Sequence, residues 1–427
     1  MNDQSKTFII GLDGVPYGML KGFADDGTMP NTAKLIGSGV FKQMRSSIPD
    51  ISSVAWSSII TGVNPATHGI FGFIDLKPNS YKMFFPNFNN LKADPFWIKA
   101  KKPSVIINVP ATYPVKPMNG VHISGFVSID FEKSVYPPSI IDNIMSVDYR
   151  LDVDSVKARE SMELFLKDAD QTLDGRIEAG RYLWETQEFG TFMMVFTGTD
   201  RLMHFLWCAY EDEQHQYHEL FVDHFRKIDR AIGEILEQVT ENDTVITLSD
   251  HGFERLYYEV FINRLLEQKG LLKFRPGADP ALDSICEGTK AFALDPARIY
   301  VNLKEKYPCG TVDAGQRDAV IAELEQLLTE LAIDGKKVIK NIYRKEDVYE
   351  GPYFDEAPDL ILISESGFNM KGSMASKEVF SKGIFTGKHT YEDAFVLVSG
   401  PGAVDELPEE PSVIDAGKLI TKLVTKE

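Results

Sequence analysis

Continuous apolar runs alternate along this chain with longer segments in which apolar residues recur every three or four positions. The short runs predict strands that are buried on both faces, and the periodic segments predict amphipathic helices. Such alternation predicts an α/β fold with a mostly parallel, doubly wound sheet sandwiched by helices. The predicted strands cover residues 7–12, 104–109, 191–196, 244–248, 359–364 and 394–399, and the predicted helices cover 156–188, 218–239 and 316–333.

Two segments depart from this alternation. Residues from about 70 to 100 are rich in Phe, Asn and Pro and predict a loop-rich excursion. Residues from about 255 to 385 interrupt the core after the fourth strand, although we expect the strand at 359–364 to return to the core sheet. The predicted organisation is therefore a core domain in two parts, residues 1–254 and 356–427, around a cap insertion over residues 255–355.

Composition and charge exclude several classes of protein. The 427 residues are 43% hydrophobic and 25% charged, which is enough for a large core and argues against disorder. The net charge of −18 argues against a nucleic acid polymer or an anionic membrane as a partner. No apolar run approaches the roughly 18 residues of a spanning helix, the N-terminus lacks a signal-peptide pattern, and three scattered cysteines form no disulfide framework. We expect a cytoplasmic protein with a small-molecule substrate; its oligomeric state stays open.

Acidic residues follow three of the predicted strands. Asp13 comes directly after the first strand, Asp200 follows the strand at 191–196, and Asp250 follows the strand at 244–248. Ligands of open parallel sheets bind beyond the carboxyl ends of the strands, which lie at one edge. We therefore expect the three carboxylates to converge.

Histidines accompany the same strand ends. His204 lies one helical turn after Asp200, His251 adjoins Asp250, and His389 lies in a glycine-containing loop before the last strand. Asp and His together suit divalent metals, with Zn²⁺ first and Mn²⁺ or Fe as alternatives. Three of each are enough for two adjacent ions, and we expect Gly252 to let the backbone turn around one of them. Of the other histidines, we expect His68 to be structural and His215, His218 and His224 to be solvated.

A serine-rich helix supplies a candidate nucleophile. A proline-bounded loop leads into a helix that we expect to begin near Ser52 or Ser53 and to end at Gly62. Ser52 as an N-cap would account for its position fully. The same position at a helix N-terminus also suits a nucleophile, because phosphate binds there and a nearby divalent ion lowers the pKa of a hydroxyl. Both interpretations stay open.

Taken in order, these motifs resemble the alkaline phosphatase superfamily, and the nearest branch is the type I phosphodiesterase/nucleotide pyrophosphatase family. The resemblance spans residue 7 to about 402. It depends on Asp13 in GLDG, on Thr61-Gly62 followed by His68-Gly69-Ile70, on Asp200-x-x-x-His204, on Asp250-His251-Gly252 and on His389.

The resemblance implies an alkaline phosphatase-like fold with two metal ions side by side. It assigns Ser52, nine residues before Thr61, as the nucleophile and as a ligand of the second ion, with Ser53 as the alternative. The first ion would be held by Asp200, His204 and His389, and the second by Asp13, Asp250 and His251.

Two departures narrow the expected substrate. Ala55 stands three residues after Ser52, where nucleotide pyrophosphatases usually carry an asparagine, and this weakens the case for a nucleotide. No [CS]-x-P-x-R motif is present, which argues against a sulfatase. The expected activity is cleavage of phosphate esters, foremost phosphodiesters, through a phosphoserine on a two-metal site. The alternatives are a phosphomonoesterase, a phosphonate hydrolase, a phosphomutase or a non-catalytic metal-binding protein.

The loop after the strand at 104–109 offers further candidates. Thr112 and Tyr113 lie in a proline-containing turn at a strand end, so we expect them either to shape that turn or to contact the substrate.

Overall fold

The computed structural model describes residues 5–401 and 407–426 and divides into two compact units. The first unit comprises the chain up to Val63, Asn87–Phe253, and the chain from Phe385 onward. The second unit comprises Asn64–Pro86 and Glu254–Ile384. The early excursion after residue 63 therefore folds with the later insertion.

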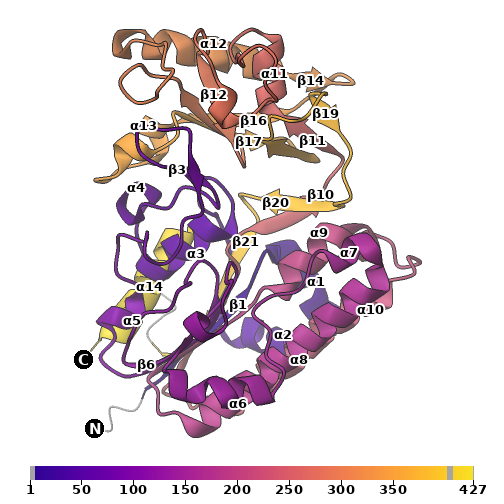
Figure 1. Ribbon diagram of the computed structural model, residues 1–427. Coiled ribbons are helices and arrows are strands. Elements are labelled where there is room, and N and C mark those ends of the chain that lie inside the picture. The colour runs from indigo at the N-terminus through magenta and orange to yellow at the C-terminus, as the bar shows by residue number, and fades with distance from the viewer. Residues whose placement is uncertain (1–4, 402–406, 427) are drawn as a thin grey trace. The chain divides into compact units, whose positions relative to one another are not determined.

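An eight-stranded sheet forms the centre of the first unit (Figure 1), with the order β2-β21-β9-β1-β8-β5-β6-β7. Strand β1 pairs in parallel with β8 on one side and with β9 on the other. Only β21 and β7 run against the rest, so the predicted mostly parallel sheet is confirmed. The strands are β1 Thr7–Leu12, β2 Val40–Met44, β5 Ser104–Val109, β6 Gly120–Ser124, β7 Val135–Tyr136, β8 Thr191–Phe196, β9 Thr244–Leu248 and β21 Ala394–Ser399.

Helices cover both faces of this sheet (Figure 1), as predicted. Alternate strand residues enter two cores: Phe8 and Ile10 of β1 pack on one face, whereas Ile9 between them packs on the other. This double burial explains why the central strands are continuous apolar runs. One face carries α1 Tyr17–Asp25, α2 Pro30–Ser38, α8 Met162–Thr186, α9 Gly198–Glu211 and α10 His218–Leu236; the other carries α3 Ser52–Thr61, α5 Phe96–Lys99 and α14 Val413–Thr425.

The second unit has its own core around an antiparallel four-stranded sheet, in the order β12-β13-β17-β16. Fully buried Arg298 ties the early excursion to this sheet, because its guanidinium donates to the Asp75 carboxylate and to the Ile74 carbonyl. The elements of the insertion include β11 Tyr258–Phe261, α11 Ile262–Gln268, β12 Ala291–Leu294, β13 Arg298–Val301, α12 Arg317–Thr329, β16 Ile339–Arg344, α13 Lys345–Val348, β17 Leu360–Ser364, β18 Phe368–Lys371 and β19 Phe380–Ser381. The excursion contributes α4 Pro65–His68, β3 Asp75–Leu76 and β4 Met83–Phe84.

Several predicted elements differ from the observed ones. The expectation that the strand at 359–364 returns to the core sheet is wrong, because β17 pairs with β13 and β16 in the second unit. The helix predicted over 156–188 is broken at Ser161, whose hydroxyl caps α8 by accepting from Leu164 N; a short helix, α7 Lys157–Glu160, precedes it. Edge strand β2 was not predicted, because its sequence VFKQM is not a continuous apolar run. The strand is only partly buried in the structure.

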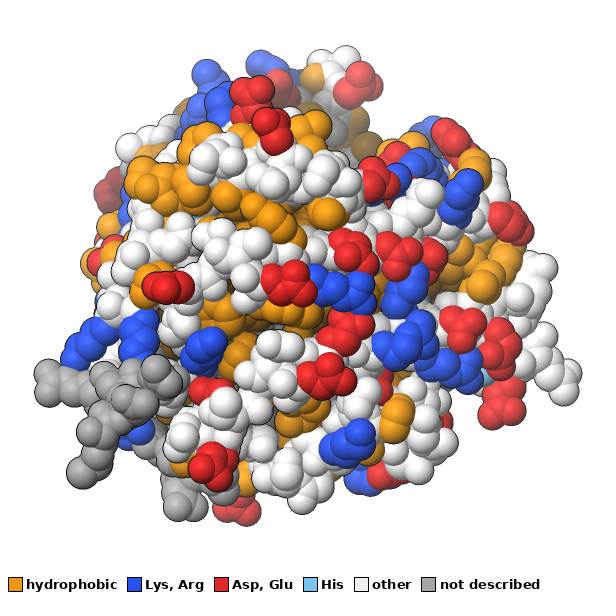
Figure 2. Space-filling view, turned by 90° about the horizontal axis from the view of Figure 1, so that it is seen from below, with side chains coloured by type: hydrophobic (Ala, Val, Ile, Leu, Met, Phe, Trp, Pro, Cys, Tyr) orange, Lys and Arg blue, Asp and Glu red, His pale blue; other side chains and the backbone are white. Residues whose placement is uncertain are grey.

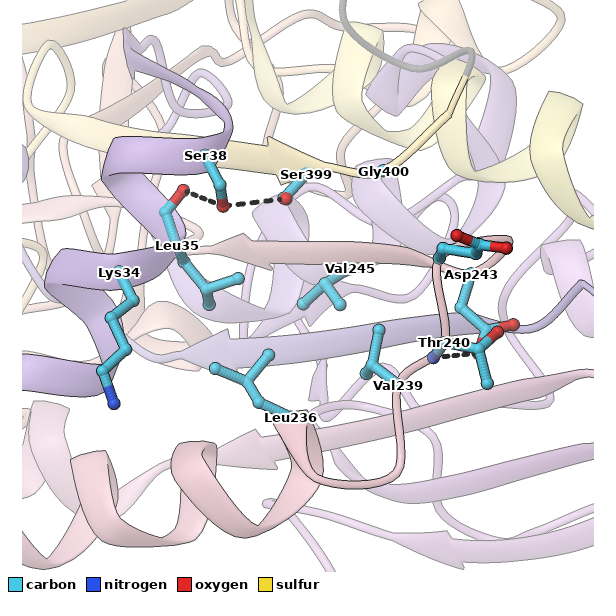
Figure 3. Close-up of a pocket in the computed structure, with 11 residues that line it drawn as sticks. Lys34, Leu35, Ser38, Leu236, Val239, Thr240, Asp243, Val245, Ser399 and Gly400 are labelled. Carbon is cyan, nitrogen blue, oxygen red and sulfur yellow. Dashed lines mark hydrogen bonds between the residues drawn. The ribbon is translucent and has the colours of Figure 1, made fainter.

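The described surface of the first unit includes a hollow at the amino end of the central sheet, away from the carboxyl ends of the strands. Acidic and basic side chains are interspersed over the face shown in Figure 2. At the amino end of β9, a hollow of about 300 Å³ is lined mainly by aliphatic residues such as Leu35, Leu236 and Val245, and Thr240 and Asp243 bond each other beside it (Figure 3). None of its lining residues is a histidine. Within the described residues, no helix is long and apolar enough to span a bilayer, and the three cysteines are unpaired thiols.

Candidate active site

The three predicted carboxylates converge at the carboxyl edge of the sheet. Their strands are neighbours in the order β9-β1-β8, so Asp250, Asp13 and Asp200 extend from three adjacent strand ends. All three side chains are buried. Asp200 itself lies in the first turn of α9, one turn before His204, and His204 Nε2 is 3.5 Å from Asp200 Oδ1.

Each carboxylate has one oxygen tied to a protein donor, which leaves the other oxygen for the centre of the cluster. Trp56 Nε1 donates to Asp13 Oδ2 at 2.9 Å, and Gly14 N donates to Asp250 Oδ1 at 3.0 Å. Arg201 Nη1 donates to Asp200 Oδ2 at 2.6 Å. The second oxygen of each carboxylate is the one that could bind a metal.

The three histidines are oriented in a matching way. The Nδ1 atoms of His204, His251 and His389 lie 3.2, 3.1 and 3.0 Å from the backbone carbonyls of Gly387, Gly252 and Asp50, respectively. A carbonyl oxygen only accepts, so each ring donates its Nδ1–H and, when neutral, keeps a lone pair on Nε2. This is the usual support for histidines that bind metals through Nε2.

The Nε2 atoms and the remaining carboxylate oxygens face one another at short range. His389 Nε2 lies 3.0 Å from both Asp200 Oδ1 and His204 Nε2. His251 Nε2 lies 3.4 Å from Asp250 Oδ2 and 3.8 Å from Asp13 Oδ1. Two sets of three residues offer ligand atoms that all lie within 4.8 Å of one another, namely Asp13, Asp250 and His251, and Asp200, His251 and His389.

The electrostatics of the cluster favour a cation. Burial, reinforced by the charges of Asp250 and Asp200, raises the pKa of Asp13 well above its usual value, and burial also raises the pKa of Asp250. At Asp200, burial alone would raise the pKa, but contacts with His204, His389 and Arg201 hold it well below its usual range. Burial lowers the pKa of His204 and of His251, which favours the neutral form that can bind a metal.

An unpartnered buried atom tests whether a metal fits here. Asp250 Oδ2 is buried and accepts no hydrogen bond from the described residues, although such a group normally has a partner. It faces the lone pair of His251 Nε2, and two electron-rich atoms at this distance repel each other. A divalent cation between them would satisfy both, so the donor set fits a metal site of the Zn²⁺ type.

Ser52 occupies the first position of α3 and contacts this cluster. Its Oγ lies 3.3 Å from Asp13 Oδ1 and 3.2 Å from His251 Nε2. The N-cap residue is Ile51, so the interpretation of Ser52 as an N-cap is wrong. Neighbouring Ser53 is also buried, and its Oγ has no hydrogen-bond partner among the described residues.

The two glycines beside the cluster have different roles. Gly14 adopts φ +73°, and an added Cβ would lie 3.1 Å from His251 Cε1, so glycine is required where the chain leaves β1. Gly252 was expected to form a tight turn around an ion. Instead it begins strand β10 Gly252–Arg255, where an added Cβ would lie 2.7 Å from the Asp393 carbonyl. Close backbone packing therefore explains that glycine.

Thr112 and Tyr113 are not brought to the cluster by any hydrogen bond or ion pair of the described residues. The Thr112 hydroxyl is fully buried; it donates to the Val109 carbonyl and lies 3.1 Å from His122 Nε2. These hydrogen bonds are the ones expected if Thr112 shapes the turn. A contact of Thr112 or Tyr113 with the substrate stays a prediction.

Of the remaining histidines, His68 is fully buried, as expected for a structural residue, whereas the expectation for His224 is wrong. His224 is only 6% exposed, since it lies on the buried face of α10.

The residues that sequence reasoning missed are the donors that hold the outer oxygens of the candidate ligands Asp200 and Asp13. Arg201 immediately follows Asp200, and Trp56 lies one turn after Ser52 on the same helix. The spacing of Trp56 from Ser52 was a usable signal, because positions i and i+4 share a helix face. The adjacency of Arg201 to Asp200 was a weaker one.

Comparison with known proteins defines the class. The family described as type I phosphodiesterase/nucleotide pyrophosphatase matches residues 7–392, so the chain belongs to this family. It is accordingly a metal-dependent hydrolase of the phosphodiesterase/phosphatase type. Among curated proteins, none matches the sequence.

Solved structures share the fold at low identity. Phosphonoacetate hydrolase from Sinorhizobium meliloti 1021, in complex with phosphonoformate, is 14% identical with a TM-score of 0.66. Murine ectonucleotide pyrophosphatase/phosphodiesterase 5 is 15% identical with a TM-score of 0.55, and the human protein is 15% identical with a TM-score of 0.58. Each of these alignments covers 99% of this chain and 96% of the other. They confirm the alkaline phosphatase-like fold.

Proposed function

We propose that the chain hydrolyses phosphate esters, with phosphodiesters as the favoured class, and that Ser52 is the nucleophile. The observation that carries the proposal is the contact of Ser52 Oγ with Asp13 and His251 at 3.3 and 3.2 Å. Membership of the type I phosphodiesterase family supports the substrate class.

The cluster residues would hold two divalent cations. Bound there, the cations would stabilise the negative charge that develops on the attacking and leaving oxygens during in-line transfer. Zn²⁺ is the preferred identity for a mixed Asp/His set, with Mn²⁺ or Fe as alternatives. One ion is assigned to Asp13, Asp250 and His251, with Ser52 beside it, and the other to Asp200, His204 and His389.

The chain's own residues account for the remaining chemistry. The Ser52 hydroxyl proton has two acceptors in reach, Asp13 Oδ1 and His251 Nε2. As Ser52 Oγ bonds to phosphorus, the bond from phosphorus to the leaving oxygen breaks. Ser52 then carries the phosphoryl group, which keeps its second ester group when the substrate is a diester. Water then attacks the same phosphorus, and the Ser52 oxygen leaves as the hydroxyl is restored. The Val54 and Ala55 amides donate to the Ile51 carbonyl. The Ser52 and Ser53 amides, at the start of α3, would therefore be the ones to bind a phosphoryl oxygen.

The test compares a diester with a monoester on matched serine variants. Bis(p-nitrophenyl) phosphate and p-nitrophenyl phosphate are assayed side by side with the Zn²⁺- or Mn²⁺-loaded protein, as wild type, Ser52→Ala and Ser53→Ala. We expect faster cleavage of the diester, loss of about 10³-fold or more of the rate in Ser52→Ala, and near-normal rates in Ser53→Ala. Mass spectrometry of acid-quenched protein should locate the phosphoryl group on Ser52.

Each alternative has its own outcome in this assay. A faster monoester reaction would favour a phosphomonoesterase or a phosphomutase. Cleavage of phosphonates alone would favour a phosphonate hydrolase, the activity named for the structurally similar Sinorhizobium meliloti protein. Loss of activity in Ser53→Ala but not in Ser52→Ala would indicate that Ser53 is the nucleophile. Full activity after exhaustive EDTA treatment would contradict the metal assignment.

Two further expectations belong to this proposal. We propose that the insertion predicted between residues 255 and 385, which belongs to the second unit, sets the substrate specificity, since loops and insertions of α/β enzymes commonly do so. We also retain the cytoplasmic location as a proposal, which fractionation of the native host would check.

A further inference from the structure

Arg201 is a largely buried cation directly behind one of the candidate metal ligands. Its side chain is 16% exposed. Its Nη1 donates to Asp200 Oδ2 at 2.6 Å, while its Nε and Nη2 donate to Asp152 Oδ2 at 3.2 and 3.0 Å. The guanidinium also lies over the Phe126 ring, 4.2 Å from its centroid. Four contacts on three sides therefore fix the guanidinium.

The anchor of Arg201 is itself held in place. Asp152 Oδ1 accepts from Thr197 Oγ1 at 3.3 Å, and Thr197 directly follows strand β8. The Thr197 hydroxyl oxygen in turn receives buried Arg176 Nη1 at 3.0 Å. Asp152 thus links Arg201 to the end of β8, the strand that Asp200 also follows.

We propose that Arg201, anchored by Asp152, is a positioning residue that presents Asp200 to its metal through Oδ1 alone. The inference rests on the proposed function, because it assumes that Asp200 is a metal ligand. Asp200 is the only one of the three carboxylates whose outer oxygen is held by a charged donor. Asp13 and Asp250 are held by the neutral Trp56 indole and the Gly14 amide.

A purely electrostatic role makes the opposite prediction. A guanidinium near a bound cation repels it, so loss of the charge alone would tighten metal binding. A positioning role requires the planar fork as well as the charge, and lysine cannot replace that fork. Loss of such a supporting contact typically weakens metal affinity by about 10- to 100-fold.

The test is a stepwise Zn²⁺ titration of metal-free, full-length protein against a chromophoric chelator, with circular dichroism to check folding. The variants are Arg201→Lys, Arg201→Met and Asp152→Asn. The matched control is Arg181→Lys, which changes an arginine that pairs with Glu234 and Glu178 between α8 and α10, at a partly exposed position. We expect one of two binding steps to weaken about 10-fold or more in both Arg201 variants and less in Asp152→Asn. The other step, and both steps in Arg181→Lys, should be unchanged.

Several outcomes would overturn the inference. Wild-type affinity in Arg201→Lys would contradict the need for the fork, and tighter binding in Arg201→Met would indicate a purely electrostatic role. Equal weakening of both steps would indicate a general structural defect. If the Arg201 variants fail to fold, unchanged affinity in Asp152→Asn would still contradict the inference. Wild-type protein that binds fewer than two ions would contradict the proposed function as well, which separates the two failures.

Discussion

The Trp56 indole donates to Asp13 Oδ2 at 2.9 Å, and this bond ties the helix of the candidate nucleophile to the carboxylate that the nucleophile contacts. Ser52 and Trp56 are one helical turn apart on α3, and both side chains reach Asp13 at the end of β1. The position of Ser52 is therefore set by a bond across two elements as well as by its own helix.

Replacing Trp56 by Phe should lower the turnover rate more than the stability. A smaller aromatic ring remains, but the N–H donor to Asp13 is lost; a hydrogen bond to a charged group contributes about 1.5–3 kcal/mol. We expect a roughly 10-fold or greater fall in kcat on bis(p-nitrophenyl) phosphate. Trp97→Phe is the matched control, since Trp97 is also buried on this face of the sheet and no hydrogen bond of its indole is found in the described part of the chain. Equal losses in both variants would show that packing alone matters.

Any side chain larger than that of glycine at Gly11 of β1 should destabilise the protein, because the core around it is filled. A Cβ added there would lie 2.5 Å from Trp56 Cη2 and 2.9 Å from Val195 Cγ2, both in a filled core. Gly11→Ala should therefore destabilise the protein by about 1–3 kcal/mol in urea unfolding. Gly22→Ala, in helix α1 with no atom within 4 Å of the added Cβ, should have the opposite sign, a gain of about 0.5–1 kcal/mol. A neutral Gly11→Ala would mean that α3 can shift.

Sequence reasoning predicted the convergence of the three carboxylates because each follows an apolar strand, and the sheet order β9-β1-β8 brings those strand ends together. Sequence reasoning could not show that residues 64–86 belong to the second unit whereas Asn87–Phe253 belongs to the first. Residues 64–86 fold with the insertion through Asp75 and Arg298, which are more than 220 residues apart in the chain, and no local pattern encodes that pairing. The strand at 359–364 has the same apolar pattern whichever sheet it joins, so its partner was not predictable from periodicity.

The supporting donors were hidden for a related reason. Arg201 and Trp56 carry no motif by themselves, and their roles appear only when their distances to Asp200 and Asp13 are known. His224 was misassigned because its helix has an apolar stripe broad enough to include a histidine, whose burial depends on the neighbouring helix.

Stability should fall with acidification through a buried histidine outside the candidate site. Burial lowers the pKa of His122 to about 3, and its Nδ1 has no partner in the described residues, so the native protein keeps it neutral. The unfolded chain protonates it below the usual value of about 6.5. The contribution of the neutral ring is complete above that pH and is lost as the pH falls from about 6.5 toward 3.

The expected loss from this one group between pH 7.5 and 5.5 is about 1.4 kcal/mol. His122→Gln retains a donor near Thr112 but does not titrate, so its unfolding free energy should fall less over this interval. Urea unfolding of both proteins at the two pH values measures the difference. Identical pH slopes would contradict the assignment of a neutral native His122.

Asp250→Asn should separate stability from metal binding. In the wild type, Asp250 Oδ2 is buried without a hydrogen-bond partner and faces His251 Nε2 at 3.4 Å. An amide nitrogen in that place would donate to the imidazole, while the other atom still accepts from Gly14 N. In EDTA the variant should therefore be more stable than the wild type, by roughly 1–3 kcal/mol. With Zn²⁺ added the order should reverse, because a ligand that binds only the native state stabilises it by an amount that grows with the logarithm of its affinity. Thermal unfolding of both proteins with EDTA and with Zn²⁺ gives the four values needed. If Asp250→Asn is less stable than the wild type in EDTA, the carboxylate has a structural partner, and the unpartnered oxygen is no sign of a cation site.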